Sequence, residues 1–198
     1  MNKNFPDNLV LKVKDISRGG FGVLSLYEDK KTKKKYMVKE LYKKNTRQYR
    51  NLTYIKDICK DFYVCPEGMY EKDGKYYIIT EYLDGFIPLR QSKELFSMKE
   101  KETILKKIQK EIELLHEKNM THNDIKPDNI MVNPKTKKVR IIDFGSAIIH
   151  SFFYLYRLAD VGYTKKYTKL DPYQYYFKNK FIENDFYALS LIRSWYKN

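Results

Sequence analysis

Residues 122–129 read His122-Asn-Asp-Ile-Lys-Pro-Asp-Asn129, and the triplet Asp143-Phe-Gly145 follows after thirteen further residues. Those thirteen residues hold two short apolar runs, Ile130–Val132 and Val139–Ile142, separated by a turn that begins at Asn133-Pro134. Apolar runs of this length on either side of a turn predict two short strands. We therefore expect two polar loops, one before the pair of strands and one after it.

The side chains in these two loops are the types that phosphoryl transfer requires. That reaction needs a carboxylate to orient the attacking hydroxyl, oxygen ligands for magnesium, and a positive charge near the phosphoryl group that moves. Asp124 and Asp143 supply carboxylates, Asn129 an amide oxygen and Lys126 an ammonium group. Each could be an ordinary polar loop residue, but the four together at these spacings are a specific signal.

A second group of residues lies near the start of the chain. The run Ile16-Ser-Arg-Gly-Gly-Phe-Gly-Val23 separates two strand-like segments, and Lys39 follows on the next one. A glycine-rich hairpin lets backbone amides approach phosphate oxygens, and a lysine on the adjacent strand can neutralise them. Alone this loop is weak evidence, because glycine turns are common in β-hairpins.

The chain up to about residue 83 has the pattern of a small β-rich lobe. Short runs of apolar and polar residues broken by turns predict five strands: Leu9–Ile16, Val23–Glu28, Tyr36–Leu41, Met69–Glu71 and Lys75–Glu81. Apolar residues at three- or four-residue spacing predict one amphipathic helix over residues 46–60.

After Gly85 the pattern becomes helical. Apolar residues fall on one face of a helix predicted over residues 98–118, and a last helix is predicted over Asp185–Trp195. We therefore expect a single domain over residues 1–198, with a first lobe over about 1–83, a hinge at about 83–86 and a second lobe over about 87–198.

The composition is that of a folded, basic protein. With 42% hydrophobic and 16% aromatic residues, the chain is not of the disordered class, and two cysteines cannot make a disulfide scaffold. The net charge of +14 could suit nucleic acid, an anionic membrane or an acidic protein, or could reflect an AT-rich genome. Only seven of the 39 cations are arginine, which argues against sequence-reading nucleic-acid binding because that relies on the arginine fork.

The cysteines and the start of the chain bear on its location. Cys59 and Cys65 match no zinc spacing, and we expect them to be reduced thiols in a cytosol-like compartment. The first fifteen residues lack the apolar core of a signal peptide, and no apolar run reaches the length of a membrane span. We therefore expect a cytoplasmic protein made without a cleaved leader and without a membrane span.

The residues quoted above resemble those of the eukaryotic-type protein kinases over nearly the whole chain. The resemblance implies an α+β, bilobal protein-kinase-like fold with a β-rich first lobe and a shortened, mostly helical second lobe, and it implies ATP and Mg²⁺ as cofactors. It also implies that Asp124 is the catalytic base and that Lys126, as in Ser/Thr-directed kinases, steadies the γ-phosphate. Asn129 and Asp143 would hold magnesium.

The same resemblance implies the nucleotide-binding residues. Lys39 would pair with the α- and β-phosphates, Thr80 falls at the gatekeeper position, and Glu81 and Leu83 would present hinge backbone groups to adenine. The residues of the loop over the phosphates would be Ile16, Ser17, Gly19, Gly20, Phe21 and Gly22. Asp185 resembles the acidic residue that opens the helix supporting the catalytic loop.

Three positions depart from the family pattern. Ser17 stands where the first loop glycine is usual. Asn123 replaces the arginine that normally docks an activation-loop phosphate, which argues against control by loop phosphorylation. The expected helix partner of Lys39 falls near Asn51 rather than on a carboxylate, and Asp57 is the nearest acid, in a shifted register.

The length also departs from the family, because the sequence stops thirteen residues after Asp185 where the second lobe usually continues. A kinase of this size is similar to the small secreted bacterial effector kinases of the OspG and NleH class. That resemblance implies secretion into a host cell without a cleaved leader, and a partner such as a ubiquitin-charged conjugating enzyme or another acidic protein. A viral or other minimal kinase is an alternative.

Three functions therefore stay open. We expect a Ser/Thr protein kinase that transfers the γ-phosphoryl group of ATP·Mg to protein hydroxyls, with stimulation by a partner as a further expectation. The alternative is a pseudokinase-like binding module, favoured by Ser17 and the absent helix carboxylate and opposed by the complete set of catalytic residue types. A small-molecule kinase is the third, against which Lys126 and Asp143-Phe-Gly145 argue.

Overall fold

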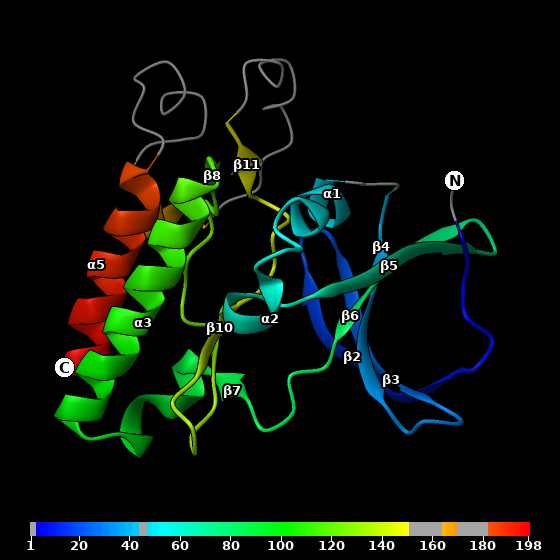
Figure 1. Ribbon diagram of the computed structural model, residues 1–198, viewed down its shortest axis with the longest axis horizontal. Coiled ribbons are helices and arrows are strands. Elements are labelled where there is room, and N and C mark those ends of the chain that lie inside the picture. Colours follow the sequence, from blue (N-terminus) through cyan, green and yellow to red (C-terminus); the bar gives the residue numbers. More distant parts are fainter. Residues whose placement is uncertain (1–2, 44–46, 151–163, 170–181) are drawn as a thin grey trace. The chain divides into compact units, whose positions relative to one another are not determined.

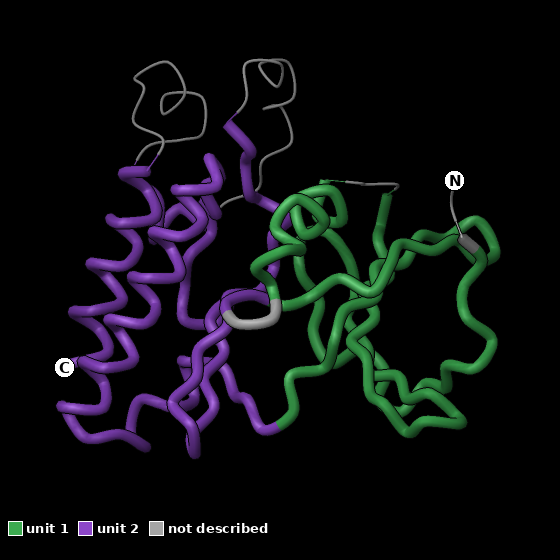
Figure 2. The backbone as a smooth tube through the Cα atoms, viewed as in Figure 1, with its two compact units in different colours: residues 1–60, 64–84 green, residues 61–63, 85–198 purple. Residues whose placement is uncertain are grey.

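The computed structural model describes residues 3–43, 47–150, 164–169 and 182–198 (Figure 1). The chain divides into two compact units (Figure 2). The first unit consists of residues 1–60 and 64–84, and the second of residues 61–63 and 85–198.

A six-stranded sheet forms most of the first unit, in the order β1-β5-β6-β4-β3-β2. Its strands are β1 (Lys3–Asn4), β2 (Leu9–Gly19), β3 (Gly22–Asp29), β4 (Lys35–Leu41), β5 (Pro66–Lys72) and β6 (Lys75–Glu81). Neighbours pair antiparallel except β1, which pairs parallel to β5. The five predicted strands are present, and β1 is an addition, because a two-residue strand carries no alternation that a sequence could reveal.

Aromatic packing explains why β1 joins the sheet. The ring of Phe5 packs edge-on against Tyr27, Tyr70 and Tyr77, with centroid separations of 5.6, 6.3 and 5.0 Å. Edge-to-face pairs each add about 0.5–1.5 kcal/mol beyond the buried area. The Phe5 N–H also donates to the Glu71 carbonyl at 3.2 Å, so the start of the chain covers the β5 edge.

The single helix predicted over residues 46–60 is wrong. The segment forms α1 (Arg47–Tyr54), a tight turn, and a short helix α2 (Cys59–Phe62). In the turn, the Ile58 N–H donates to the Ile55 carbonyl at 3.1 Å. Of the apolar side chains whose spacing predicted the helix, Leu52 and Ile55 are buried, whereas Tyr49, Ile58 and Phe62 are only partly buried. A turn can place such side chains inward as a continuous helix would, so their spacing does not determine the length of the helix.

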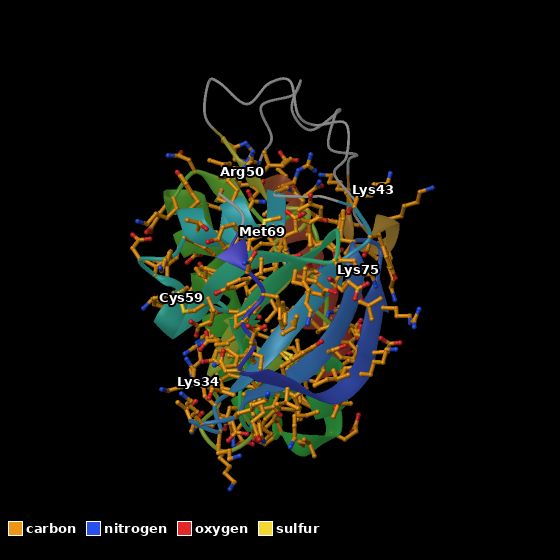
Figure 3. The ribbon with its side chains drawn as sticks, turned by 90° about the vertical axis from the view of Figure 1, so that its right-hand side faces the viewer. Lys34, Lys43, Arg50, Cys59, Met69 and Lys75 are labelled. Carbon is orange, nitrogen blue, oxygen red and sulfur yellow. A yellow bond between two sulfur atoms is a disulfide. The ribbon has the colours of Figure 1, made fainter. Side chains whose placement is uncertain are left out.

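Cys59 and Cys65 form a disulfide in the first unit, with Cα atoms 5.1 Å apart (Figure 3 labels Cys59). This corrects the expectation of reduced thiols. The two residues are six positions apart in the sequence, and they meet because the chain reverses direction after α2 to enter β5. Spacing alone does not reveal such a reversal.

Two helices, α3 (Met98–Glu117) and α5 (Glu183–Lys197), lie side by side in the second unit (Figure 1). They run antiparallel, since Arg193 pairs with Glu102 at 2.8 Å near one end and His116 bonds to Asp185 at 3.0 Å near the other. The remaining elements are short: β7 (Ile87–Pro88), η1 (Leu89–Leu95), β8 (Met120–Thr121), β9 (Ile130–Val132), β10 (Val139–Ile141), β11 (Ile148–Ile149) and η3 (Lys165–Tyr167). They form two small sheets, β10-β9-β7 and β11-β8.

Helix α3 begins and packs as its sequence predicts. Ser97 and Glu100 form a capping box, with the Glu100 N–H donating to the Ser97 hydroxyl at 3.4 Å and the Ser97 N–H donating to the Glu100 carboxylate at 3.0 Å. The predicted apolar face is fully buried and consists of Ile104, Leu105, Ile108, Ile112 and Leu115. Burying each such side chain stabilises the fold by roughly 1.5–3 kcal/mol. None of the described helices is long and apolar enough to cross a bilayer.

Candidate active site

Asp124 is the centre of a hydrogen-bonded cluster in the second unit. Its Oδ2 accepts hydrogen bonds from the Lys126 ammonium group at 2.7 Å and the Asn129 amide at 2.9 Å, and its Oδ1 accepts one from the Thr164 hydroxyl at 2.6 Å. The Lys126 ammonium group also donates to the Thr164 hydroxyl at 3.0 Å. The cluster brings together three of the residues singled out in the sequence and adds Thr164, which was missed.

Asp185, in the first turn of α5, holds the loop that carries Asp124. Its Oδ2 accepts the backbone N–H of His122 at 2.8 Å, and its Oδ1 accepts the backbone N–H of Asn123 at 2.9 Å. The His116 ring on α3 donates to Oδ2 at 3.0 Å. Hydrogen bonds to an ionised carboxylate are about twice as strong as neutral ones, so this carboxylate fixes the backbone that leads into Asp124.

His122 ties the same loop to the segment before Asp143. Its buried ring donates from Nε2 to the Ile142 carbonyl at 3.0 Å, so Nδ1 is the acceptor that receives the Asp124 N–H at 3.3 Å. The ring also packs edge-on against Phe144, with centroids 5.0 Å apart. These contacts give His122 a structural role.

Asn129 and Asp143, the predicted magnesium ligands, lie at the same end of the β9–β10 hairpin. The Ile142 N–H donates to the Asn129 carbonyl at 2.9 Å. The Asn129 amide nitrogen is used by two oxygens of Asp124, which turns its Oδ1 away from that residue. Amide and carboxylate oxygens are ligands that Mg²⁺ accepts, so the two side chains fit a magnesium site.

In the first unit, Lys39 on β4 donates a hydrogen bond to Gln48 on α1, with 2.9 Å between Nζ and Oε1. Its ammonium group also lies 5.6 Å from the centre of the Phe21 ring. The sequence placed the helix partner near Asn51, or at Asp57 in a shifted register. Asn51 is buried on α1 and Asp57 is exposed in the turn after it. Gln48, which accepts this hydrogen bond from Lys39, lies one turn before Asn51.

The glycine-rich loop connects β2 to β3. Ile16, Ser17 and Gly19 end β2, Gly20 and Phe21 form the turn, and Gly22 begins β3. A Cβ at Gly22 would lie 2.1 Å from the Glu40 carbonyl oxygen, so only glycine allows β3 to approach β4 this closely. Around Gly19 and Gly20 a Cβ would meet nothing within 4 Å, which leaves the backbone of the turn accessible to a ligand.

The predicted adenine contacts lie at the end of β6. Glu81 closes the strand after Thr80, and Leu83 follows it. The Glu81 N–H donates to the Cys65 carbonyl at 3.1 Å, and its carboxylate accepts the Cys65 N–H at 2.7 Å. Because Cys65 is also half of the disulfide, the end of β6 is attached firmly to the segment before β5.

Asn123 belongs to a network of uncharged groups. Its amide donates to the Thr121 hydroxyl at 3.0 Å and to the Ser146 carbonyl at 3.4 Å. The Thr121 hydroxyl in turn shares a 2.8 Å hydrogen bond with His150. Burial lowers the pKa of His150 to about 4, so this ring is neutral near pH 7. Asn123, at the position where the family usually has a phosphate-docking arginine, thus has a short, neutral side chain among uncharged partners.

Gln48 and Thr164 are the two residues of the candidate site that sequence reasoning missed. Gln48 is buried on a short helix, one turn before the position near Asn51 that the family pattern indicated for the partner of Lys39. Thr164 reaches Asp124 across forty positions of sequence, and nothing in its local sequence signals the contact.

Sequence comparison finds similarity to protein kinases. The sequence profile of the protein kinase domain matches residues 11–168. Putative serine/threonine-protein kinase R436 of Acanthamoeba polyphaga mimivirus is 30% identical, over 62% of this chain and 42% of that protein. Myosin light chain kinase A of Dictyostelium discoideum is 28% identical, over 66% of this chain and 48% of that protein. The chain thus spans less than half the length of these relatives.

Two solved structures superpose on this chain. The Cydia pomonella granulovirus kinase PK-1 superposes with a TM-score of 0.73 at 16% identity, over 96% of this chain and 68% of that chain. Rad53 1-466, in complex with AMP-PNP, superposes with a TM-score of 0.70 at 20% identity, over 94% of this chain and 47% of that chain. These are likenesses of fold, and they confirm the fold class predicted from the sequence.

Proposed function

Because the chain belongs to the protein kinase domain family, we propose that it transfers the γ-phosphoryl group of ATP to serine or threonine hydroxyls of proteins. The observation that carries the proposal is the cluster around Asp124. Its carboxylate already accepts a hydroxyl hydrogen bond from Thr164 at 2.6 Å, so a hydroxyl donor can reach Oδ1. A substrate hydroxyl that met the same carboxylate would be oriented for attack.

The other residues have complementary roles in this proposal. Lys126, 2.7 Å from the Asp124 carboxylate, would neutralise charge on the phosphoryl group in transit. Asn129 and Asp143 would hold Mg²⁺, which neutralises phosphate charge when bound. Lys39 and the open backbone at Gly19-Gly20 would meet the phosphates. The AMP-PNP complex of Rad53, a protein of the same fold, supports nucleotide binding.

We also propose the finer assignment, a secreted effector kinase similar to the OspG and NleH class that acts inside a host cell and is stimulated by a protein partner. The net charge of +14 supports it, because a strongly basic chain suits an acidic protein partner. A partner such as a ubiquitin-charged conjugating enzyme could stabilise the productive arrangement.

The test is transfer of labelled γ-phosphate from ATP·Mg to the protein itself and to a generic protein substrate, with and without the charged conjugating enzyme. We expect Asp124→Asn to lower turnover at least ~10²-fold while nucleotide affinity is nearly kept. Asp143→Asn should abolish magnesium-dependent nucleotide binding. The matched control is Asp128→Asn in the same loop, because Asp128 is exposed and pairs with Arg90 at the surface; its turnover should change less than about twofold.

Two outcomes would overturn the proposal. Equal turnover of wild type and Asp124→Asn would remove Asp124 from the reaction. A folded protein that binds nucleotide or the partner but transfers no phosphate under any condition would be the pseudokinase-like binding module. Transfer without any stimulation by the partner would overturn only the finer assignment.

A further inference from the structure

One corner of the second unit combines exposed apolar side chains with lysines. It is formed by the end of η1, the start of α3, the tip of the β9–β10 hairpin and the end of α5, and in Figure 1 these segments lie around the lower end of α3. The Lys137 ammonium group lies 3.2 Å from the Glu100 carboxylate and 4.9 Å from the centre of the Phe96 ring. Lys93 lies 5.4 Å from the centre of the Trp195 ring. We call residues 93–99, 133–138 and 195 the basic corner.

The charge of the basic corner is strongly positive. It contains one acidic residue, Glu94, and five lysines: Lys93, Lys99, Lys135, Lys137 and Lys138. Glu100, next to the corner, pairs with Lys137. Lys99, Lys135 and Lys138 are exposed, so their charge is available to an anionic partner.

The hairpin tip presents its lysines on a rigid turn. The Asn133 N–H donates to the Lys138 carbonyl at 2.9 Å, and the Lys137 N–H donates back to the Asn133 carbonyl at 2.8 Å. The Asn133 side chain accepts the N–H groups of Lys135 and Thr136, both at 3.0 Å. Because the backbone is already ordered, little further entropy is lost when these lysines contact a partner.

Apolar side chains project from the same corner. Leu95 is 57% exposed and Met98 is 55% exposed, whereas Phe96 between them is 8% exposed and belongs to the core. Trp195 is partly exposed beside Lys93. Water-exposed leucine and methionine are common singly, but here two lie within four residues of each other, between Lys93 and Lys99 in the sequence.

We propose that the basic corner is a docking surface for an anionic lipid bilayer. Leu95 and Met98 stand out at the junction of two helical segments, and hydrocarbon accepts protruding side chains of any shape, while a protein partner would have to offer a matching pocket for each. Lysines place their charge at the level of the headgroups while their stems follow the apolar side chains. Tryptophan prefers the interface between water and hydrocarbon.

The test uses the full chain and vesicles of phosphatidylcholine, with or without phosphatidylserine, in sedimentation and fluorescence assays. Trp195 is the one tryptophan of the sequence, so its emission reports on this corner directly. We expect binding and a blue shift with phosphatidylserine vesicles, little of either with phosphatidylcholine, and weaker binding as salt rises.

Variants separate the apolar contribution to vesicle binding from the electrostatic one. Leu95→Ser with Met98→Ser should lower the affinity for phosphatidylserine vesicles about tenfold, as should Lys135→Glu with Lys138→Glu. The matched control is Lys30→Glu with Lys31→Glu in the β3–β4 turn, which has the same charge change and the same type of turn in the first unit. Its affinity should stay within about twofold of wild type. Thermal unfolding of each variant shows that it is folded.

Three results would overturn the proposal. The first is an absence of binding to phosphatidylserine vesicles. The second is an equal loss of affinity in the control and in the Lys135 and Lys138 variant, which would show attraction by net charge alone. The third is a shift of Trp195 emission by polyglutamate but not by vesicles, which would make the corner a docking surface for an acidic protein.

Discussion

Gln48 accepts a hydrogen bond from the Lys39 ammonium group. The amide is 8% exposed, and its Oε1 lies 2.9 Å from the Lys39 ammonium group. A hydrogen bond between a charged and a neutral group contributes about 1.5–3 kcal/mol, enough to orient the lysine toward one position. Gln48 therefore contributes to the position of Lys39 that the proposed function requires.

Gln48→Ala should lower kcat/KM for ATP about tenfold, because the lysine loses an acceptor that helps to orient it. The kcat/KM of Gln48→Glu for ATP should equal or exceed that of the wild type, since glutamate keeps an acceptor at this position and adds a negative charge. Steady-state phosphoryl transfer measures both variants, with thermal unfolding to show that they are folded.

The control for this prediction is Tyr54→Ala, which removes an exposed side chain from the same helix. Wild-type kinetics in Gln48→Ala would show that the contact does not orient Lys39. Slower transfer by Gln48→Glu than by Gln48→Ala would show that a negative charge there is harmful.

At the scale of single residues, sequence predicted the grouping of Asp124, Lys126 and Asn129, because the three lie within six positions and one loop must hold them together. It did not predict Thr164 or Gln48. Both make their contacts through tertiary packing, and the helix partner of Lys39 was expected near Asn51, or at Asp57 in a shifted register, rather than at Gln48.

At the scale of elements, two hairpin tips have the same construction. Residues 29–34 and residues 133–138 each begin with an Asx side chain that accepts two backbone N–H groups. Each places a lysine in the left-handed region at its fifth position, with φ of 60° at Lys33 and 56° at Lys137. That conformation costs a non-glycine residue roughly 1–2 kcal/mol.

Lys33→Gly should therefore stabilise the protein by about 0.5–1 kcal/mol, because glycine adopts positive φ without steric cost. Lys137→Gly should stabilise it less, since Lys137 also pairs with Glu100 and packs over Phe96. Urea unfolding of both variants measures the difference.

The control is Lys31→Gly in the same turn, where φ is not positive and glycine should destabilise the fold. A loss of stability in Lys33→Gly as large as in Lys31→Gly would contradict the argument from backbone strain.

The helices show how much secondary structure the spacing of apolar residues can predict. For α3 the apolar face and the bounds agree with the prediction over residues 98–118, and the element forms as predicted. The 46–60 segment had the apolar spacing of a helix, yet it forms α1, a turn and α2, with a disulfide after the turn. The chain reversal that joins Cys59 to Cys65 depends on tertiary structure, and local spacing cannot reveal it.

For the whole molecule, buried ionisable groups link folding stability to pH. Glu111 on α3 is 4% exposed, and burial raises the pKa of its carboxyl well above the ordinary value, although Arg140 and Lys107 lie close enough to oppose the shift. Tyr63 donates its hydroxyl to the backbone carbonyl of Glu111, so the residue is packed inside the second unit. Burial lowers the pKa of His150 to about 4, so the folded state also resists protonation of that ring.

The sign of the Glu111 effect follows from the direction of its shift. Below the ordinary carboxyl pKa the group is protonated in both states and contributes nothing to the pH dependence. As pH rises from that value toward the raised pKa, the unfolded state loses its proton first, so the free energy of unfolding falls. Above the raised pKa the carboxyl group is ionised in both states, so the free energy of unfolding stays at its lowered value and no longer changes with the titration of Glu111.

Glu111→Gln should therefore raise the free energy of unfolding at pH 7, by on the order of 1–2 kcal/mol, because an amide of the same shape carries no charge to desolvate. Near pH 4 the variant and the wild type should be equally stable. Urea unfolding followed by the helix signal over this pH range measures the difference. The control is Glu113→Gln, at an exposed position of the same helix, which should show no such dependence. Lower stability of Glu111→Gln than of wild type at pH 7 would mean that the ionised carboxylate, held by Arg140 and Lys107, stabilises the folded state after all.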